Sequence, residues 1–289
     1  MSNNTTISDP TGRFLKNPTL LNAHKLISCF HGYDTETGIE VSWHEISLSS
    51  FSPEEIANLS KNVKKAQTFS CSNILSVLKW WINEESNQLI YITETVGNTS
   101  IGNRKEMGIT TCSSKSVARW ALGVLQALNY LHCQHPPVVH NLINLYTIYV
   151  NPSTMNVKIV PPRMSPFRPG ERSNSVLIRP WMAPESFSNI KTVKSDIWSL
   201  GIAICSALSS IEVYSECKSP YDLYKKIVTF SLPNAIETIT DPLARDLIIM
   251  CLKPTEERPS AAELLVHPFF RQEFPKQPLK SHSAIQFLF

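Results

Sequence analysis

Residues Trp181–Ser210 read WMAPESFSNIKTVKSDIWSLGIAICSALSS, and the second half of this stretch decides the fold. From Ile197 to Leu208 the sequence is apolar on nearly every side, and Ser195 and Asp196 before it are residues that favour helix starts. A helix that is apolar all round is buried. It is shorter than the ~20 residues that span a bilayer, so it belongs in a protein interior. We therefore expect other helices to pack around it.

Two charged residues far apart in the chain flank this helix in sequence. Glu185 closes the turn Ala183–Pro184–Glu185 just upstream, and Arg258 precedes a predicted helix at Ser260–Val266. A Glu and an Arg brought together beside a buried helix would form a buried ion pair. Such a pair holds structure and does no chemistry.

The combination of A-P-E, S-D-I-W-S-L-G and E-R-P-S-A-A-E-L-L-x-H-P-F-F resembles the C-terminal lobe of the protein kinases. The resemblance extends from about His31 to Phe270. It implies an α+β, bilobal protein kinase-like fold, with a small antiparallel-sheet N-lobe and a larger helical C-lobe. It also implies that Glu185 pairs with Arg258 and that Asp196 braces the catalytic loop.

Composition agrees with a globular domain in a reducing compartment. Of the 289 residues 42% are hydrophobic and 18% charged, and no apolar run reaches the ~18 residues of a membrane span. Met1–Pro10 lacks the apolar core of a secretory signal, and the seven cysteines form no C-x-x-C pair. We expect reduced thiols, no membrane span and a cytoplasmic location. Nuclear or endomembrane association is an option that only the family resemblance described below implies.

The net charge of +3 is unevenly spread. Between Met107 and Pro184 seven basic residues face one acidic residue, Glu171, which gives a local charge of +6. Four arginines of one proline-rich loop could dock an acidic or phosphorylated partner, although a solvated loop is the plainer interpretation. They are Arg163, Arg168, Arg172 and Arg179. The low overall charge does not support nucleic-acid binding.

The kinase resemblance and the order of the predicted elements imply four units: a flexible tail (1–16), an N-lobe (17–96), a C-lobe (97–274) and a C-terminal tail (275–289). A polar linker is expected at Gly97–Gly108. The expected strands are Leu26–Phe30, Ile39–Trp43, Ile74–Trp81, Leu89–Thr93, Thr147–Val150 and Val157–Val160. The expected helices are Pro53–Thr68, Ser116–His132, Pro220–Val228, Pro242–Leu252 and Ser260–Val266.

Phosphoryl transfer needs a phosphate cradle, a cation on the phosphates, carboxylates for magnesium and a base near the acceptor hydroxyl. The segment where the cradle belongs, Asn22–Phe30, contains no glycine. The lysine position of V-A-I-K falls on His44, and the helix glutamate that would hold it falls on Asn62.

The catalytic loop H-R-D-L-x-x-x-N corresponds to residues 140–147. Its base position is Leu142, and its magnesium-ligand position is Thr147. The D-F-G position is Pro161–Pro162–Arg163. No carboxylate remains at these positions to hold a metal ion.

From these replacements we predict a catalytically inactive kinase-like scaffold or adaptor, a pseudokinase without cofactor or metal. Two alternatives stay open. In the first, ATP binds without transfer at a hinge near Glu94 and Val96 and switches the arrangement of the lobes. In the second, a residually active serine/threonine kinase works by an unusual route.

The run Gly32–Glu45, GYDTETGIEVSWHE, resembles the with-no-lysine kinases and their inactive relatives, the nuclear receptor-binding protein family. Pro136–His140 and Asp241–Arg245 resemble the inactive family. This resemblance implies protein partners such as leucine-zipper regulators, small GTPase components or ubiquitin-ligase components.

Overall fold

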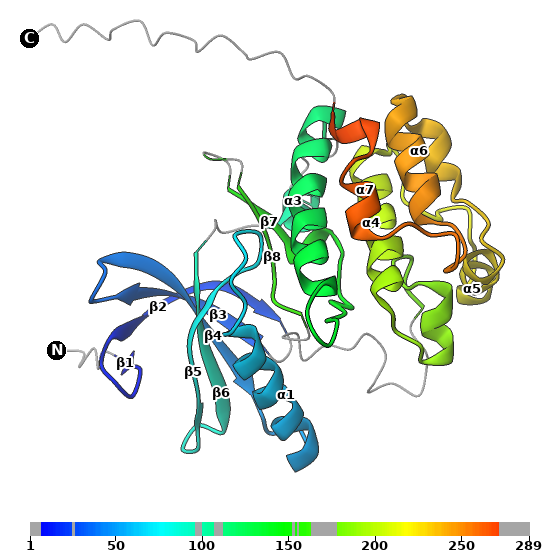
Figure 1. Cartoon of the computed structure of the whole chain (residues 1–289). Helices are drawn as coiled ribbons and strands as arrows, with labels where there is room; N and C mark the ends of the chain where they lie inside the picture. The colour runs from blue at the N-terminus through cyan, green and yellow to red at the C-terminus, as the bar shows by residue number, and fades with distance from the viewer. Residues whose placement is uncertain are drawn as a thin grey trace, which may run out of the picture.

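The computed structural model describes residues 7–24, 27–95, 100–106, 112–151, 154, 156–162 and 178–271. A twisted sheet with one helix forms the N-terminal part, and a set of helices forms the C-terminal part (Figure 1). The α+β fold class and its two-part arrangement are thus confirmed.

The sheet is antiparallel, with strands in the order β1-β2-β3-β4-β6-β5. The strands are β1 (Ile7–Ser8), β2 (Phe14–His24), β3 (Ile27–Asp34), β4 (Ile39–Ser47), β5 (Val77–Asn83) and β6 (Gln88–Glu94). The hairpin between β3 and β4 turns at Thr35–Gly38, where Gly38 has φ +73°. That backbone conformation strains residues with a Cβ, so a glycine suits the position.

The start of the chain differs from the expected flexible tail. Ile7–Ser8 form β1, and Phe14–Lys16 form the beginning of β2 and pair with β1. The turn between them is held by Asp9, which is 2% exposed and accepts hydrogen bonds from the backbone of Thr11 and Phe14. A polar sequence therefore forms an ordered edge of the sheet, because its side chains satisfy the turn backbone.

Helix α1 (Pro53–Ala66) packs on the sheet as its sequence predicts. Ser52 and Glu55 form a capping box at its start, with Ser52 N donating to Glu55 Oε2 at 2.7 Å. Its buried face carries Leu59, Val63 and Ala66. These side chains form one apolar cluster with residues of β4, β5 and β6.

Helix α4 (Val193–Leu208) lies at the centre of the C-terminal part, where twelve consecutive or nearly consecutive residues are buried. Gly201 is the point of closest approach to α6, since a Cβ there would lie 2.5 Å from Cys251 Cβ. The other helices are α2 (Ile101–Glu106), α3 (Ser114–His132), α5 (Pro220–Val228), α6 (Pro242–Cys251) and α7 (Ala261–Leu264). The prediction of a buried central helix is confirmed.

Short elements connect these helices. The hairpin of β7 (Ile148–Val150) and β8 (Val157–Ile159) follows a 3₁₀ turn, η1 (Leu145–Thr147). Three further 3₁₀ turns are η2 (Pro184–Ser188), η3 (Asn234–Thr238) and η4 (Pro268–Phe270). Helix α2 lies within the segment predicted as a polar linker, so that prediction missed a helix.

Two further sequence predictions can be compared with the structure. All seven cysteines lie in the described part and are free thiols. None of the helices in the described ranges is both long and apolar enough to cross a membrane.

Candidate active site

The loop at residues 140–147 is attached to the central helix by one buried carboxylate. Asp196, which is 0% exposed, accepts hydrogen bonds from the backbone N–H groups of His140 at 2.8 Å and Asn141 at 2.7 Å. His132 Nε2, at the end of α3, lies 3.0 Å from the same carboxylate. Three donors therefore fix the start of the loop to α4.

Both ring nitrogens of His140 form hydrogen bonds with the backbone. Nε2 lies 2.8 Å from the carbonyl oxygen of Val160, and Nδ1 accepts from the backbone N–H of Leu142 at 3.2 Å. Burial lowers the pKa of His140, although the nearby Asp196 opposes this shift. A neutral ring with its proton on Nε2 satisfies both contacts.

The position expected for a magnesium ligand closes the loop instead. The hydroxyl of Thr147 lies 2.8 Å from the carbonyl oxygen of Leu142 and 2.9 Å from that of Asn144. It also accepts from the N–H of Asn144 at 3.1 Å. Leu142, at the position expected for the base, is half-buried, and its side chain cannot accept a proton.

His44, at the position expected for the lysine, lies on β4 opposite Tyr91 of β6. Its ring stacks on Tyr91 with centroids 4.5 Å apart, and Nε2 lies 3.0 Å from Thr93 Oγ1. Burial lowers the pKa of His44 to about 4 and raises the pKa of Tyr91. Burial likewise raises the pKa of Cys29, which pairs with His44 across β3 and β4, to about 12. All three groups are thus neutral at pH 7.

The predicted hinge residue Glu94 is bound within the protein. Its Oε1 accepts from the N–H of Ser76 at 2.7 Å and from Lys158 Nζ at 2.8 Å. Next to it, the hydroxyls of Ser42 and Thr95 are 3.2 Å apart. Val96, the other predicted hinge residue, lies outside the described residues.

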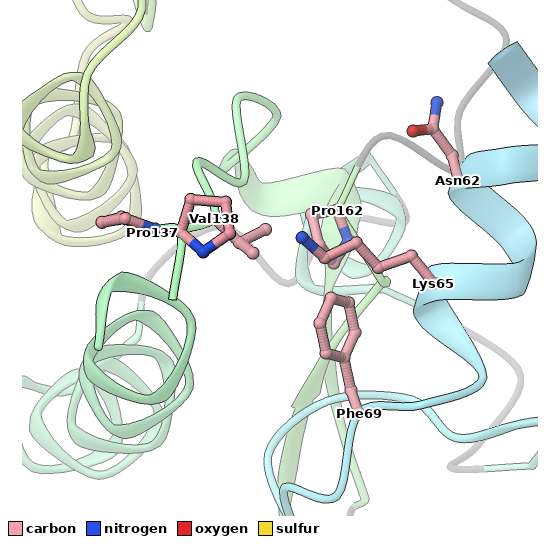
Figure 2. A pocket seen from close by; sticks show the side chains of 7 residues that line it. Asn62, Lys65, Phe69, Pro137, Val138 and Pro162 are labelled. Carbon is pink, nitrogen blue, oxygen red and sulfur yellow. The ribbon is translucent and has the colours of Figure 1, made fainter. Parts of the chain in front are cut away.

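Asn62 and Pro162 both line a small pocket of about 210 Å³ (Figure 2). Asn62 and Lys65 come from α1, and Lys65 extends toward Pro162. Pro137 and Val138, which lead into the 140–147 loop, form the far side. The structure therefore does bring Asn62 near the D-F-G position, although neither Asn62 nor the buried Pro161 and Pro162 carries a charge.

The positions present do not fit a divalent cation. Among the described residues no three His, Cys, Asp or Glu side chains lie close enough together to hold a metal ion. Thr147 and Pro161 supply no carboxylate, so these positions cannot provide the oxygen ligands that a magnesium ion requires.

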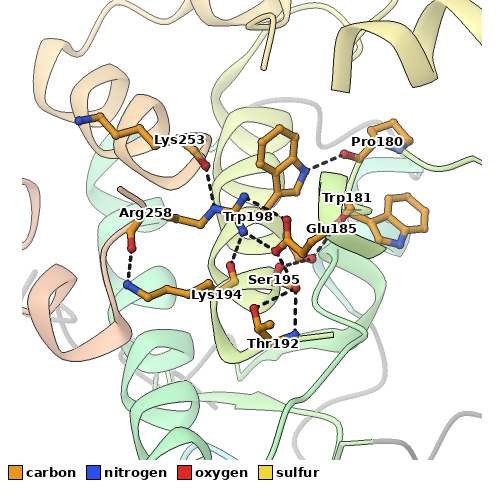
Figure 3. A network of polar contacts seen from close by, with 10 residues as sticks. Pro180, Trp181, Glu185, Thr192, Lys194, Ser195, Trp198, Lys253 and Arg258 are labelled. Atoms are coloured by element: carbon orange, nitrogen blue, oxygen red, sulfur yellow. Dashed lines mark hydrogen bonds and ion pairs between the residues drawn. The ribbon is translucent and has the colours of Figure 1, made fainter. Parts of the chain in front are cut away.

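A second network, remote from the cleft, joins Glu185 to Arg258 (Figure 3). Arg258 Nη1 donates to Glu185 Oε1 at 2.7 Å and to the carbonyl oxygen of Lys194 at 2.8 Å. Arg258 Nε donates to the carbonyl oxygen of Lys253 at 3.0 Å, and Ser195 Oγ donates to Glu185 Oε1 at 2.7 Å. Burial would raise the pKa of Glu185, but the hydrogen bonds from Arg258 and Ser195 hold it below its ordinary value.

Of the four arginines singled out in the sequence, the structure describes one. The guanidinium carbon of Arg179 lies 5.8 Å from the ring centroid of Trp181. Arg163, Arg168 and Arg172 lie outside the described residues.

Sequence reasoning missed two contacts that support this site. The first is His132 against Asp196, which only its place at the end of an amphipathic helix could have suggested. The second is the ion pair between Glu94 and Lys158, whose residues are 64 positions apart. Nothing in the sequence indicates that pairing.

The comparison with protein families is decisive for the fold. The family model of the protein kinase domain matches residues 26–270 of this chain. The chain belongs to the protein kinase family. The extent of the match agrees with the resemblance seen from His31 to Phe270.

The most informative relatives are plant kinases. The chain is 29% identical over 270 residues to serine/threonine-protein kinase WNK8 of Arabidopsis thaliana, a match that covers 92% of this chain and 47% of the relative. It is 29% identical over 267 residues to probable serine/threonine-protein kinase WNK5 of Oryza sativa subsp. japonica, covering 91% and 81%. Probable serine/threonine-protein kinase WNK10 of Arabidopsis is also 29% identical, covering 89% and 49%. The chain thus spans about half the length of the two Arabidopsis relatives.

These comparisons overturn one group of predictions. A catalytically inactive scaffold or adaptor, a pseudokinase and not an enzyme, is wrong because the relatives that match most of this kinase domain are named serine/threonine kinases. The prediction equated the loss of particular side chains with the loss of the reaction. Phosphoryl transfer is mostly positioning and electrostatic stabilisation, and more than one set of residues can provide these.

Proposed function

We propose that the chain is a serine/threonine protein kinase with residual activity, transferring a phosphoryl group from ATP to a hydroxyl group of a protein. The observation that carries this proposal is the similarity over 92% of the chain to a protein named as a serine/threonine-protein kinase. That relative extends well beyond the matched part, so the proposal concerns the kinase domain alone.

The chain's own contribution is a firmly held loop beside the cleft. Asp196 anchors the loop backbone, and Thr147 closes it five residues after Leu142. A peptide hydroxyl would be positioned there without a side-chain base. Because a positioned base contributes about 10²–10⁴-fold, we expect a slow reaction.

The test is incorporation of labelled phosphate from ATP into a library of serine- and threonine-containing peptides by the purified chain. Slow incorporation that follows the folded protein through size exclusion is expected. Leu142→Asp places a carboxylate at the base position, and we expect it to raise the rate by about 10²-fold or more.

Leu142→Asn is the matched control, with nearly the same shape and no base, and its rate should stay at the wild-type level. Equal rates for all three proteins would mean that the activity comes from a contaminant. No incorporation by folded wild-type protein would overturn the proposal.

The finer predictions stay proposals. Pro136–His140 and Asp241–Arg245 support a relationship to the nuclear receptor-binding protein family. Protein partners (leucine-zipper regulators, small GTPase or ubiquitin-ligase components) are proposed on the resemblance alone. Docking of an acidic partner by the arginine loop is proposed on its local charge, and a cytoplasmic location on the composition. Partner capture with and without charge reversal at Arg179 would test the docking.

A further inference from the structure

A second and larger cavity, of about 470 Å³, opens beside the loop of the candidate active site. Its walls come from α2, η1, α4, the segment before η2 and the turn after α4. Its volume lies within the range of roughly 300–1,000 Å³ that is typical of ligand pockets. The residues that matter below are Gly102, Tyr146, Trp181, Ile202, Glu212 and Val213.

The lining is mainly apolar. Tyr146 and Trp181 present aromatic rings, and Ile202 and Val213 present aliphatic side chains. Tyr146 keeps 47% of its surface exposed although it lies within a fixed loop. Half-exposed aromatic rings around a cavity are the usual anchors for an apolar side chain of a partner.

The Tyr146 wall is set in place by a glycine. A Cβ at Gly102 would lie 2.6 Å from Cδ1 of the Tyr146 ring, so the ring lies directly against the backbone of α2. The backbone N–H of Tyr146 also donates to Asn144 Oδ1 at 2.9 Å. The wall is therefore preorganised, which lowers the entropy cost of binding.

One charge stands at the rim of this cavity. Of the lining residues that the structure describes, Glu212 alone is charged, and it is exposed. An exposed carboxylate next to an apolar cavity selects a ligand with a large apolar group and a neighbouring cation. A peptide with an apolar residue beside Lys or Arg has this chemistry.

The cavity lies beside the loop at which the substrate hydroxyl would be positioned, so a substrate peptide could reach both. Tyr146 follows Leu142 by four residues in the same short loop, and η1 forms both the end of that loop and the cavity wall. We propose that the cavity is a substrate subsite, which takes a large apolar side chain from a peptide whose adjacent Lys or Arg pairs with Glu212. The assignment as a substrate subsite rests on the proposed kinase function.

The experiment measures peptide binding by calorimetry and by Trp fluorescence, without ATP. Three serine peptides differ at two adjacent positions, which carry Leu-Arg, Ala-Arg or Leu-Glu. The Leu-Arg peptide should bind about tenfold more tightly than the other two. Equal affinities would overturn the proposal.

Variants identify where the peptide binds. Glu212→Lys should weaken binding of the Leu-Arg peptide about fivefold and remove its advantage over Leu-Glu. Tyr146→Ala should weaken it about tenfold. The control Glu257→Lys reverses a charge that is 64% exposed in a distant salt bridge and should change nothing. Unchanged affinity in both test variants would place the peptide elsewhere and overturn the assignment.

Failure of this inference is distinguishable from failure of the proposed function. Selective binding without phosphate transfer would leave the cavity as a peptide site and overturn the kinase activity. Phosphate transfer to all three peptides at equal rates, with equal affinities, would keep the activity and overturn the subsite.

Discussion

In the helical part of the molecule the buried Arg258 and the half-buried Glu185 are charged, whereas in the sheet the half-buried His44 and Cys29 are neutral. The helical part surrounds its charges with opposite charge and backbone carbonyl groups. In the sheet, by contrast, the His44 ring stacks on Tyr91 and contacts the hydroxyl of Thr93, and neither partner is charged. Removing an ionisable side chain from water is unfavourable in both regions. In the helical part an opposite charge compensates for this cost, and in the sheet the side chain stays in its neutral form. This difference can be tested from each side.

The largest expected effect comes from unpairing the helical network. Arg258→Met leaves the Glu185 carboxylate, whose side chain is 11% exposed, without its cation. Removing one partner of a buried pair costs roughly 3–5 kcal/mol, and we expect a loss of that size in urea unfolding at pH 7.

Lys253→Met is the control for this prediction. Lys253 uses only its backbone carbonyl to hold Arg258, and its side chain is 44% exposed. We expect a change within about 0.5 kcal/mol. If Arg258→Met were equally mild, the network would not be what holds η2 to α4.

The second prediction concerns the neutral His44 side chain and the pH dependence of stability that follows from it. The pKa of His44 is about 4 in the folded state, against an ordinary value of 6.5, so His44 stays neutral in the fold while the unfolded chain takes up a proton. Stability from this residue is therefore complete above pH 6.5 and is lost as the pH falls toward 4. The loss reaches about 2–3 kcal/mol.

His44→Phe keeps a ring to stack on Tyr91 and has no proton to gain. The variant should lack this part of the pH dependence, so urea unfolding of the two proteins between pH 7 and 4 gives the contribution by difference. Parallel stability curves would show that the pKa of His44 is the same in the folded and the unfolded chain, which would contradict a His44 ring that the fold keeps neutral.

The same contrast explains what could be read from the sequence. Helix α4 was predictable because its sequence from Ile197 to Leu208 is mostly apolar, and α1 because Ser52, Pro53 and Glu55 mark its start. The strand β1 and the first part of β2 were missed because Asp9 satisfies their turn through contacts that no periodicity reveals.

The sequence was sufficient to predict which residues belong to the candidate site, but not which contacts their side chains make. The resemblance to the kinase motifs assigns Leu142, Thr147 and Asn62 to positions of the active site. The use of Thr147 as a loop closure and of Glu94 as a partner of Lys158 depends on which side chains meet in space. The cavity beside Tyr146 could not be predicted, since its walls come from five separate segments.

The smallest expected effect asks whether the two regions are independent. Their apolar cores are separate clusters, and the segment Asn73–Leu75 joins the helical part through backbone hydrogen bonds to Ile159. Ser52 caps α1 in the sheet part and Ser219 caps α5 in the helical part. Replacing either serine with Ala costs about 1 kcal/mol.

We expect separate cores to open separately, which hydrogen exchange can measure. Ser52→Ala should speed amide exchange in α1 and leave exchange in α4 and α6 unchanged. Ser219→Ala should speed exchange in the helical part and leave α1 unchanged. Faster exchange throughout the chain in both variants would mean that charged and neutral regions unfold as one unit, and the contrast between them would then concern local chemistry only.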